Sequence, residues 1–306
     1  MDTLFCIEDI TNKIILGNSE IELKKIPDES IDCVIIDPPY RYLNHKLDRN
    51  FNREELFKNL YRILKNNSFL VIFGRGIVFI EDTICLKNNG FLFKEEFVFV
   101  KNRISSCVID VPRQHELAFV FSKGKAKLNR LYVDTFEYLQ NRDVSKMLDT
   151  FYLDYKNIYN ALNNKENVEI IKNYIENGIT TYRDLPRKNK HNISIRNNNF
   201  KKDYKFLSNL KKLQKGMVQS TVFNIKIEQR QYKVPTQKPI ELISRILKII
   251  SKENDLVLDC FMGGGSTALA CIKEGRRYVG IEIDKEYFDI ANKRIEELKN
   301  NYMLAL

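Results

Sequence analysis

Residues 33–40 read Cys-Val-Ile-Ile-Asp-Pro-Pro-Tyr, an apolar run that stops at two prolines. A short, continuous apolar run that ends at turn residues is typical of a parallel strand buried on both faces. The prolines cannot donate to a β-ladder, and they favour an extended, rigid turn. Because open α/β sheets bind ligands at the carboxyl ends of their strands, Asp37 and Tyr40 fall where a site is expected. The pattern therefore predicts a central strand over 31–36 with a site at its carboxyl end.

The turn offers groups that suit a planar base with an exocyclic amine. The backbone carbonyls around Pro38 and Pro39 have no helix or strand partner, so we expect them to accept hydrogen bonds from a substrate. Asp37 adds a carboxylate acceptor, and Tyr40 adds a flat ring on which a base can stack. Taken by itself, the motif also fits a plain turn at the end of a strand.

A second motif lies near the end of the chain, where a predicted strand over 256–258 ends at Asp259. A glycine-rich turn over 261–267, Phe-Met-Gly-Gly-Gly-Ser-Thr, follows it and leads into a predicted helix. Glycines let the backbone approach a ligand, and the helix N-terminus offers free N–H groups. Glu282 ends the next predicted strand, about 20 residues beyond the turn, where a carboxylate can accept two ribose hydroxyls.

This second pattern indicates a cofactor of the adenosine type. Residues 263–268 also satisfy the looser Gly-x-Gly-x-x-Ala pattern of dinucleotide folds, so a nicotinamide-dependent oxidoreductase stays open at this point. A purely structural glycine turn stays open as well.

The distribution of charge is uneven along the 306 residues. The net charge is +10, and residues 183–230 alone contain thirteen Lys or Arg against three acidic residues. The remainder is therefore neutral overall, which predicts a contact surface for a polyanion such as nucleic acid in that segment. Residues 125–182 have helical apolar spacing and no strong strand signal, so 125–230 is predicted to be an inserted, mainly helical region with a basic arm.

Several classes of protein are disfavoured by the composition. No apolar stretch reaches the roughly 18 residues that a membrane span needs, and the first residues do not resemble a signal peptide. The six cysteines are scattered without a Cys-x-x-Cys pair, and the three histidines are dispersed. We therefore expect a cytoplasmic protein with reduced thiols and no metal site.

Taken together, the motifs resemble the β group of S-adenosylmethionine-dependent amino-DNA methyltransferases, the N6-adenine/N4-cytosine family. The motifs are, in order, Asp37-Pro38-Pro39-Tyr40, His115-Glu116 before a strand, Thr236-Gln237-Lys238-Pro239, Asp259 to Thr267, and Glu282. In that group a circular permutation places the catalytic half first and the donor-binding half last, with a target-recognition region inserted between them. Two departures are Cys260, where the family usually has proline, and Asn18, where it often has aspartate.

The resemblance covers residues 14–124 and 231–299 and implies an α/β fold. The expected architecture is a doubly wound, Rossmann-like sheet, mostly parallel with one antiparallel strand. The expected divisions are 1–124 for the catalytic half, 125–230 for target recognition, and 231–306 for the donor half. The strands that end at Asp37 and Asp259 should be neighbours in the sheet.

The resemblance also implies an activity: methyl transfer from S-adenosylmethionine to the N6 amine of adenine in duplex DNA, by base flipping. The N4 amine of cytosine is the alternative target, and a catalytically dead DNA-binding partner is the non-enzymatic alternative. Double-stranded DNA is the expected partner. A cognate restriction endonuclease, an orphan modification role and a homodimer stay open.

The resemblance implies a role for the residues of each motif. The catalytic residues are expected to be Asp37, Pro38, Pro39 and Tyr40. Donor binding is expected at Asn18, Gln237, Lys238, Asp259, Phe261, Gly263, Gly265, Ser266, Thr267, Glu282 and Asp284, with Gln237-Lys238 at the methionine end. DNA contacts are expected from Arg41, His45, Arg187, Lys188, Lys190, Arg196, Lys201, Lys202, Lys211 and Lys212.

Overall fold

The computed structural model describes residues 4–40, 50–101, 114–133, 217–225, 234 and 237–303. The chain divides into two compact units, one formed by residues 1–131 with 220–306 and the other by residues 132–219. The described part of the second unit holds the short antiparallel strands β6 (Tyr132–Val133) and β7 (Met217–Val218). Among the described residues, no helix has the length and apolar character needed to cross a membrane, and no group of His, Cys, Asp or Glu side chains could hold a metal ion.

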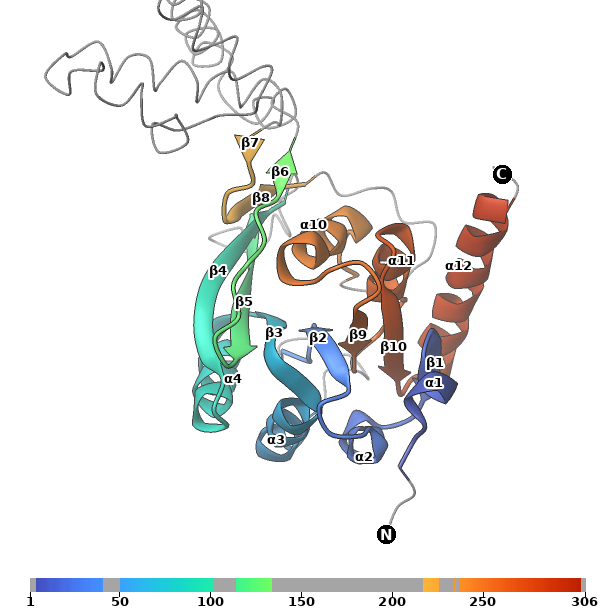
Figure 1. Cartoon of the computed structure of the whole chain (residues 1–306), viewed down its shortest axis with the longest axis horizontal. Coiled ribbons are helices and arrows are strands. Elements are labelled where there is room, and N and C mark those ends of the chain that lie inside the picture. Colours follow the sequence, from blue (N-terminus) through green and yellow to red (C-terminus); the bar gives the residue numbers. More distant parts are fainter. Residues whose placement is uncertain are drawn as a thin grey trace, which may run out of the picture. The chain divides into compact units, whose positions relative to one another are not determined.

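The first unit is built on an eight-stranded sheet (Figure 1). Its strands are β1 (Lys13–Leu16), β2 (Ile31–Ile36), β3 (Leu64–Gly74), β4 (Leu92–Val100), β5 (His115–Lys123), β8 (Val222–Asn224), β9 (Leu256–Asp259) and β10 (Arg277–Glu282). Their order is β1-β10-β9-β2-β3-β5-β4-β8. Only β5 runs antiparallel to its neighbours in this sheet, and the other pairs are parallel. The predicted fold class, a mostly parallel doubly wound sheet with one antiparallel strand, is confirmed.

Helices cover both faces of this sheet (Figure 1). They are α1 (Ile7–Ile10), α2 (Ser19–Lys25), α3 (Arg53–Ile63), α4 (Gly76–Asn88), α10 (Ile240–Ile250), α11 (Ser266–Lys273) and α12 (Lys285–Met303). Side chains of β2 alternate between the two faces of the sheet, and both faces are buried. Cys33 and Ile35 pack in the core with α10 and α11, whereas Val34 and Ile36 pack in the core with α2 and α3. Successive side chains of a strand point to opposite faces, so a strand between two helix layers buries both sets.

The strands β2 and β9 are parallel neighbours, as the resemblance implied. The chain leaves β2 towards α3 on one face of the sheet, and it leaves β9 through α11 on the opposite face. Their carboxyl ends therefore flank the topological switch point, where open α/β sheets form a ligand crevice.

The structure adds two details to the predicted secondary structure. The polar pair Asn66-Asn67 between two apolar segments predicts a helix end there and a strand from 69, yet β3 begins at Leu64, directly after α3. Leu64 pairs with Ile31, and the β2–β3 register then shifts. Asn67 has a φ of 59°, so the asparagines lie at an irregularity inside the strand.

The region over 125–230 was expected to be mainly helical, yet its described residues include the strands β6, β7 and β8. β8 lies parallel to β4 at the edge of the large sheet, and Phe223 on it is fully buried against Phe97. Strands this short form because an existing sheet edge and core receive them, which local sequence does not encode. The predicted helices of this region lie outside the described residues.

Candidate active site

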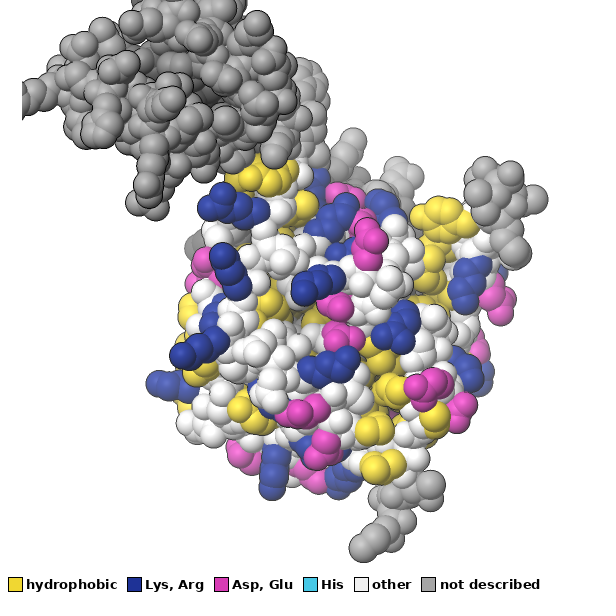
Figure 2. Space-filling view, in the orientation of Figure 1, with side chains coloured by type: hydrophobic (Ala, Val, Ile, Leu, Met, Phe, Trp, Pro, Cys, Tyr) yellow, Lys and Arg dark blue, Asp and Glu magenta, His cyan; other side chains and the backbone are white. Residues whose placement is uncertain are grey.

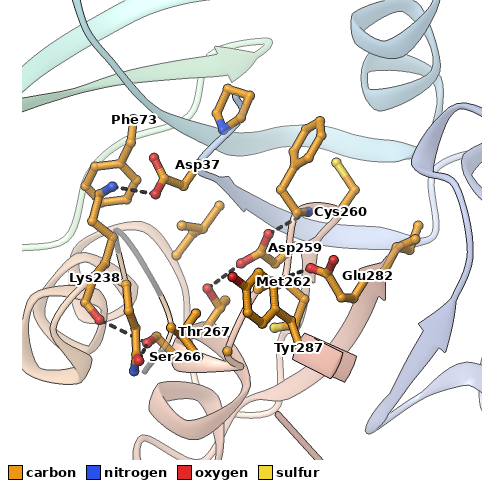
Figure 3. Close-up of a pocket in the computed structure, with 18 of the residues that line it drawn as sticks. Asp37, Phe73, Lys238, Asp259, Cys260, Met262, Ser266, Thr267, Glu282 and Tyr287 are labelled. Atoms are coloured by element: carbon orange, nitrogen blue, oxygen red, sulfur yellow. Dashed lines mark hydrogen bonds and ion pairs between the residues drawn. The ribbon is translucent and has the colours of Figure 1, made fainter. Parts of the chain in front are cut away.

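A pocket opens in the first unit at the carboxyl ends of β2, β9 and β10 (Figure 3). The predicted site residues that line it are Asp37, Pro38, Pro39, Tyr40, Gln237, Lys238, Asp259, Phe261, Gly263, Ser266, Thr267 and Glu282. Residues from the start and the end of the chain thus line one cavity. The cause is the switch point, because parallel neighbouring strands bring their carboxyl ends to the same edge of the sheet.

Asp37 is held from two sides where β2 ends. The Tyr40 hydroxyl donates to one carboxylate oxygen of Asp37, and the Lys238 ammonium forms an ion pair with the other. Burial and the nearby charge of Asp37 raise the pKa of the Tyr40 phenol well above its usual range, so the phenol stays protonated and donates. Both oxygens of Asp37 therefore have a donor.

Lys238 comes from the turn before α10, and its ammonium reaches the same point. Its Nζ lies 3.3 Å from the Tyr40 oxygen and 4.9 Å from the centre of the Phe73 ring. Burial lowers the pKa of Lys238, but the negative charges of Asp37 and Glu116 outweigh burial and raise that pKa well above its usual range. Lys238 is accordingly a buried cation.

Glu116 adds a second carboxylate to this cluster from β5. One of its oxygens pairs with the Lys101 ammonium, and the other lies 3.4 Å from Nζ of Lys238. Burial raises the pKa of Glu116, yet the nearby ammonium groups of Lys238 and Lys101 offset this and leave that pKa below its usual value. Carboxylates and ammonium groups thus alternate along a row of four side chains, in the order Asp37, Lys238, Glu116 and Lys101.

The glycine turn is held by two other carboxylates. Glu282, at the end of β10, accepts from the N–H of Gly263 (2.6 Å) and the N–H of Asp284 (2.8 Å). Asp259, at the end of β9, accepts from the N–H of Phe261 (2.9 Å) and the hydroxyl of Thr267 (2.6 Å). Burial raises the pKa of Asp259 to about 7 and raises that of Glu282 above its usual value. These acids are therefore receptive to a cation, which would restore their charged forms.

The charged side chains on the described pocket wall comprise three carboxylates, Asp37, Asp259 and Glu282, and one ammonium, Lys238. An excess of negative charge in a partly buried cavity favours a ligand that carries positive charge. A sulfonium cofactor meets this condition, and a dinucleotide pyrophosphate does not.

Three predicted donor-binding residues lie beside the pocket and begin helices. The Asn18 side chain caps α2 by accepting from the N–H of Glu20 at 3.1 Å. The Asp284 side chain accepts from the N–H of Tyr287 at the start of α12. Gly265 precedes α11 with a φ of 81°, in the left-handed region that favours glycine. Each of them stands at or before the start of a helix that carries a lining residue, namely Ser19 on α2, Ser266 on α11 and Tyr287 on α12.

The structure adds residues that sequence reasoning missed. Ser19, Phe73, Val234 and Tyr287 line the pocket, and the Ser19 hydroxyl donates to the carbonyl of Cys260. Phe73 ends the apolar run of β3, just before Gly74. Its place in the pocket could have been inferred from the rule that ligands bind at the carboxyl ends of parallel strands. The predicted DNA-contact residues Arg41, His45, Arg187, Lys188, Lys190, Arg196, Lys201, Lys202, Lys211 and Lys212 lie outside the described residues.

Comparisons with known proteins agree with this site. Residues 31–293 match the model of a family described as DNA methylase, with N6 and N4 members. The orphan methyltransferase M.BamHII of Bacillus amyloliquefaciens is 28% identical over 293 residues, which are 92% of this chain and 93% of that protein. The type II methyltransferase M2.DpnII of Streptococcus pneumoniae is 46% identical over 71 residues, which are 23% of this chain and 26% of that protein.

Solved structures show the same fold. The M1.HpyAVI–SAM complex has a TM-score of 0.55 at 23% identity and covers 92% of this chain and 98% of its own. The cytosine-N4-specific PvuII DNA methyltransferase has a TM-score of 0.54 at 16% identity, with 94% and 90% covered. The family match spans both the Asp37 strand end and the glycine turn, so the two halves of the pocket belong to one recognised domain. This chain is a member of the N6/N4 DNA methylase family.

Proposed function

We propose that this chain transfers a methyl group from S-adenosylmethionine to the N6 amine of adenine in duplex DNA. The observation that carries the proposal is the shared pocket. Asp37, to which the Tyr40 hydroxyl donates, lines one side of it, and Glu282 lies on the other side with the glycine turn (Figure 3). An acceptor site and a donor site that open into one cavity meet the first requirement of a direct group transfer.

The donor half suits S-adenosylmethionine. Glu282 would accept the ribose hydroxyls, Phe261 would contact the adenine, and the backbone at Gly263 and Gly264 would lie along the ligand. A Cβ atom at Gly264 would lie 2.9 Å from Cγ2 of Val234, so a side chain there would displace Val234, which also lines the pocket. When bound, the cofactor supplies a methyl group on a sulfonium sulfur, which keeps the electron pair of the broken C–S bond as nitrogen forms the new C–N bond.

The acceptor half would activate a poor nucleophile, because the lone pair of an adenine amine is delocalised into the ring. The Asp37 carboxylate would accept one N–H of that amine, and the backbone carbonyl of Pro38 would accept the other. These hydrogen bonds favour a tetrahedral nitrogen whose lone pair points at the methyl group. Asp37 then receives the proton that the methylated amine loses and passes it to water. Positioning and fixed charge supply most of the acceleration.

The base must leave the duplex to reach this pocket. Tyr40 and Phe73 both line the pocket at the acceptor end and offer rings for stacking. Asp in front of Pro-Pro-Tyr favours adenine by resemblance to the family. The N4 amine of cytosine is the second candidate, since the PvuII enzyme of the same fold is cytosine-N4-specific.

We further propose the division of labour that the sequence suggested: 1–124 for catalysis, 231–306 for the donor, and 125–230 for target recognition. On the described face that Figure 2 shows, Lys and Arg are interspersed with Asp and Glu. This mixture supports the proposal that the positive charge for binding DNA comes from another part of the chain. Residues 183–230, with thirteen basic and three acidic residues, have a net charge of +10. The chain would act either as an orphan modification enzyme or beside a cognate endonuclease.

Replacing Glu282 by alanine is expected to weaken binding of S-adenosylmethionine by roughly 10- to 150-fold, or about 1.5–3 kcal/mol, the value of a hydrogen bond to a charged group. Glu282→Gln, which keeps one acceptor oxygen, should lose less. Isothermal calorimetry without DNA measures both. The control is Glu296→Ala, an exposed glutamate on α12. Unchanged affinity in Glu282→Ala would remove this residue from the donor site.

Replacing Lys201, Lys202, Lys211 and Lys212 by alanine is expected to weaken DNA binding equally for target and scrambled duplexes. Each lost phosphate contact should flatten the plot of log affinity against log salt by about 0.9, so the slope should fall by roughly 3–4. A matched variant replaces four exposed lysines of the first unit, Lys58, Lys87, Lys252 and Lys299. If both variants keep the original slope, the DNA footprint lies elsewhere, for example in the segments 41–52 and 101–115.

The proposed function is tested by expressing the chain in a host without adenine methylation and sequencing the host DNA for modified bases. One short sequence should carry N6-methyladenine throughout the genome, and a host expressing Asp37→Ala should show none. N4-methylcytosine at one sequence would instead establish the second candidate.

A further inference from the structure

The ammonium of Lys238 lies with the acceptor residues. Its side chain is 6% exposed, and it contacts Asp37, Tyr40 and Glu116, which all come from the first half of the chain. The rings of Tyr40 and Phe73 flank it, with centres 5.6 and 4.9 Å from Nζ. The backbone carbonyl of Lys238, by contrast, accepts from the hydroxyl of Ser266 on the donor side at 2.9 Å. The residue thus spans the two halves, with its charge at the acceptor.

This arrangement creates a conflict for an incoming amine. Both oxygens of Asp37 already have donors, the Tyr40 hydroxyl and the Lys238 ammonium. An N–H of the target can reach Asp37 only if one of these donors gives way. An ammonium that loses its carboxylate in a buried site would be strongly unfavourable, because breaking one half of a buried ion pair leaves an uncompensated charge.

Glu116 offers a second carboxylate for that ammonium. The Oε2 atom of Glu116 lies 3.4 Å from Nζ of Lys238, is buried, and accepts no hydrogen bond from the described residues. The other oxygen is fixed by Lys101, so the carboxylate is already oriented. A shift of the ammonium by a few tenths of an ångström would convert this ion pair into a hydrogen bond of ordinary length.

We propose that Lys238 and Glu116 are positioning residues of the acceptor site: Lys238 pairs with Asp37 and moves onto Glu116 when the target amine binds Asp37. The inference rests on the proposed amine transfer. It gives the Lys238 side chain a place on the acceptor side, in contrast to the role at the methionine end that the family resemblance implied. It also accounts for the polar oxygen of Glu116 that is left without a hydrogen bond.

The test is a double-mutant cycle with Glu116→Gln, Lys238→Met and the two combined. Each single change should lower kcat by roughly 10- to 100-fold, the value of one hydrogen bond to a charged group, while the dissociation constant for S-adenosylmethionine stays within about threefold. Because Glu116 acts through Lys238, the double variant should be no slower than Lys238→Met alone. The control cycle uses Glu274→Gln and Lys248→Met, and it should leave kcat unchanged. Glu274 lies directly after α11 and Lys248 lies on α10, and the two charged groups are 3.0 Å apart.

The outcomes separate this inference from the proposed function. Wild-type protein that transfers no methyl group to DNA would refute the function itself. Wild-type protein that is active, with losses that multiply in the double variant, would overturn the inference and leave the function standing. Lys238→Met that weakens donor binding more than tenfold at unchanged kcat would return Lys238 to the donor site. Calorimetry of the donor without DNA also reports whether each variant is folded.

Discussion

Asp37→Ala is expected to lower the rate of methyl transfer by at least about a thousandfold, because it removes the carboxylate that orients the amine and takes its proton. Binding of S-adenosylmethionine should stay within about tenfold, since Glu282 and the glycine turn lie on the other side of the pocket. The fold should persist, because Lys238 retains Glu116 at 3.4 Å as a partner for its charge. Tritium transfer to DNA and donor calorimetry measure the two effects separately.

Two variants sharpen this result. Asp37→Asn keeps one acceptor oxygen of similar shape but has no charge, so it separates orientation of the amine from proton transfer. Asp289→Ala removes an exposed aspartate, paired with Lys285 on α12, and should leave turnover unchanged. Retained turnover in Asp37→Ala would mean that the chemistry is carried elsewhere in the chain.

Gly265→Val is expected to lower the free energy of unfolding by about 2–5 kcal/mol and to abolish donor binding as the turn deforms. Gly265 has a φ of 81°, a conformation that is unfavourable for a β-branched residue. A Cβ atom there would also lie 2.9 Å from Cβ and 3.2 Å from Cα of Ala291, so helix α12 would have to move away from the turn. Chemical denaturation with and without S-adenosylmethionine measures both effects.

Gly275→Val is the matched control, because Gly275 has a φ of 70° but the nearest atom to an added Cβ is Glu253 Cγ at 3.9 Å. It carries the backbone strain without the clash, so it should lose about 1–2 kcal/mol and still bind the donor. Equal losses in the two variants would show that contact with Ala291 has no part in holding the turn.

Much of the fold was predictable because its signals are local. The apolar run before Asp37 and the glycine turn after Asp259 each encode their structure within a few residues. The rule that ligands bind at the carboxyl ends of parallel strands then placed both motifs at one edge of the sheet. The adjacency of β2 and β9 came from the family resemblance, since nothing local links strands so distant in sequence.

The cluster around Lys238 was not predictable in the same way. Its contacts with Asp37 and Glu116 join three elements that lie far apart in the chain, and only the folded sheet brings them together. Local spacing carries no information about such pairings. The edge strand β8 was missed for a related reason, because its three residues form a strand only by pairing with β4.

The most direct test of the account is nucleoside mass spectrometry after purified protein is incubated with duplex DNA and S-adenosylmethionine that carries a deuterated methyl group. We expect N6-methyldeoxyadenosine with the mass of the labelled methyl group from the wild-type protein, and none from protein carrying Asp37→Ala. The duplexes should contain the sequence that is found methylated when the chain is expressed in a host. Label found only in cytosine, or in no nucleoside of these duplexes, would contradict the proposed methylation of adenine.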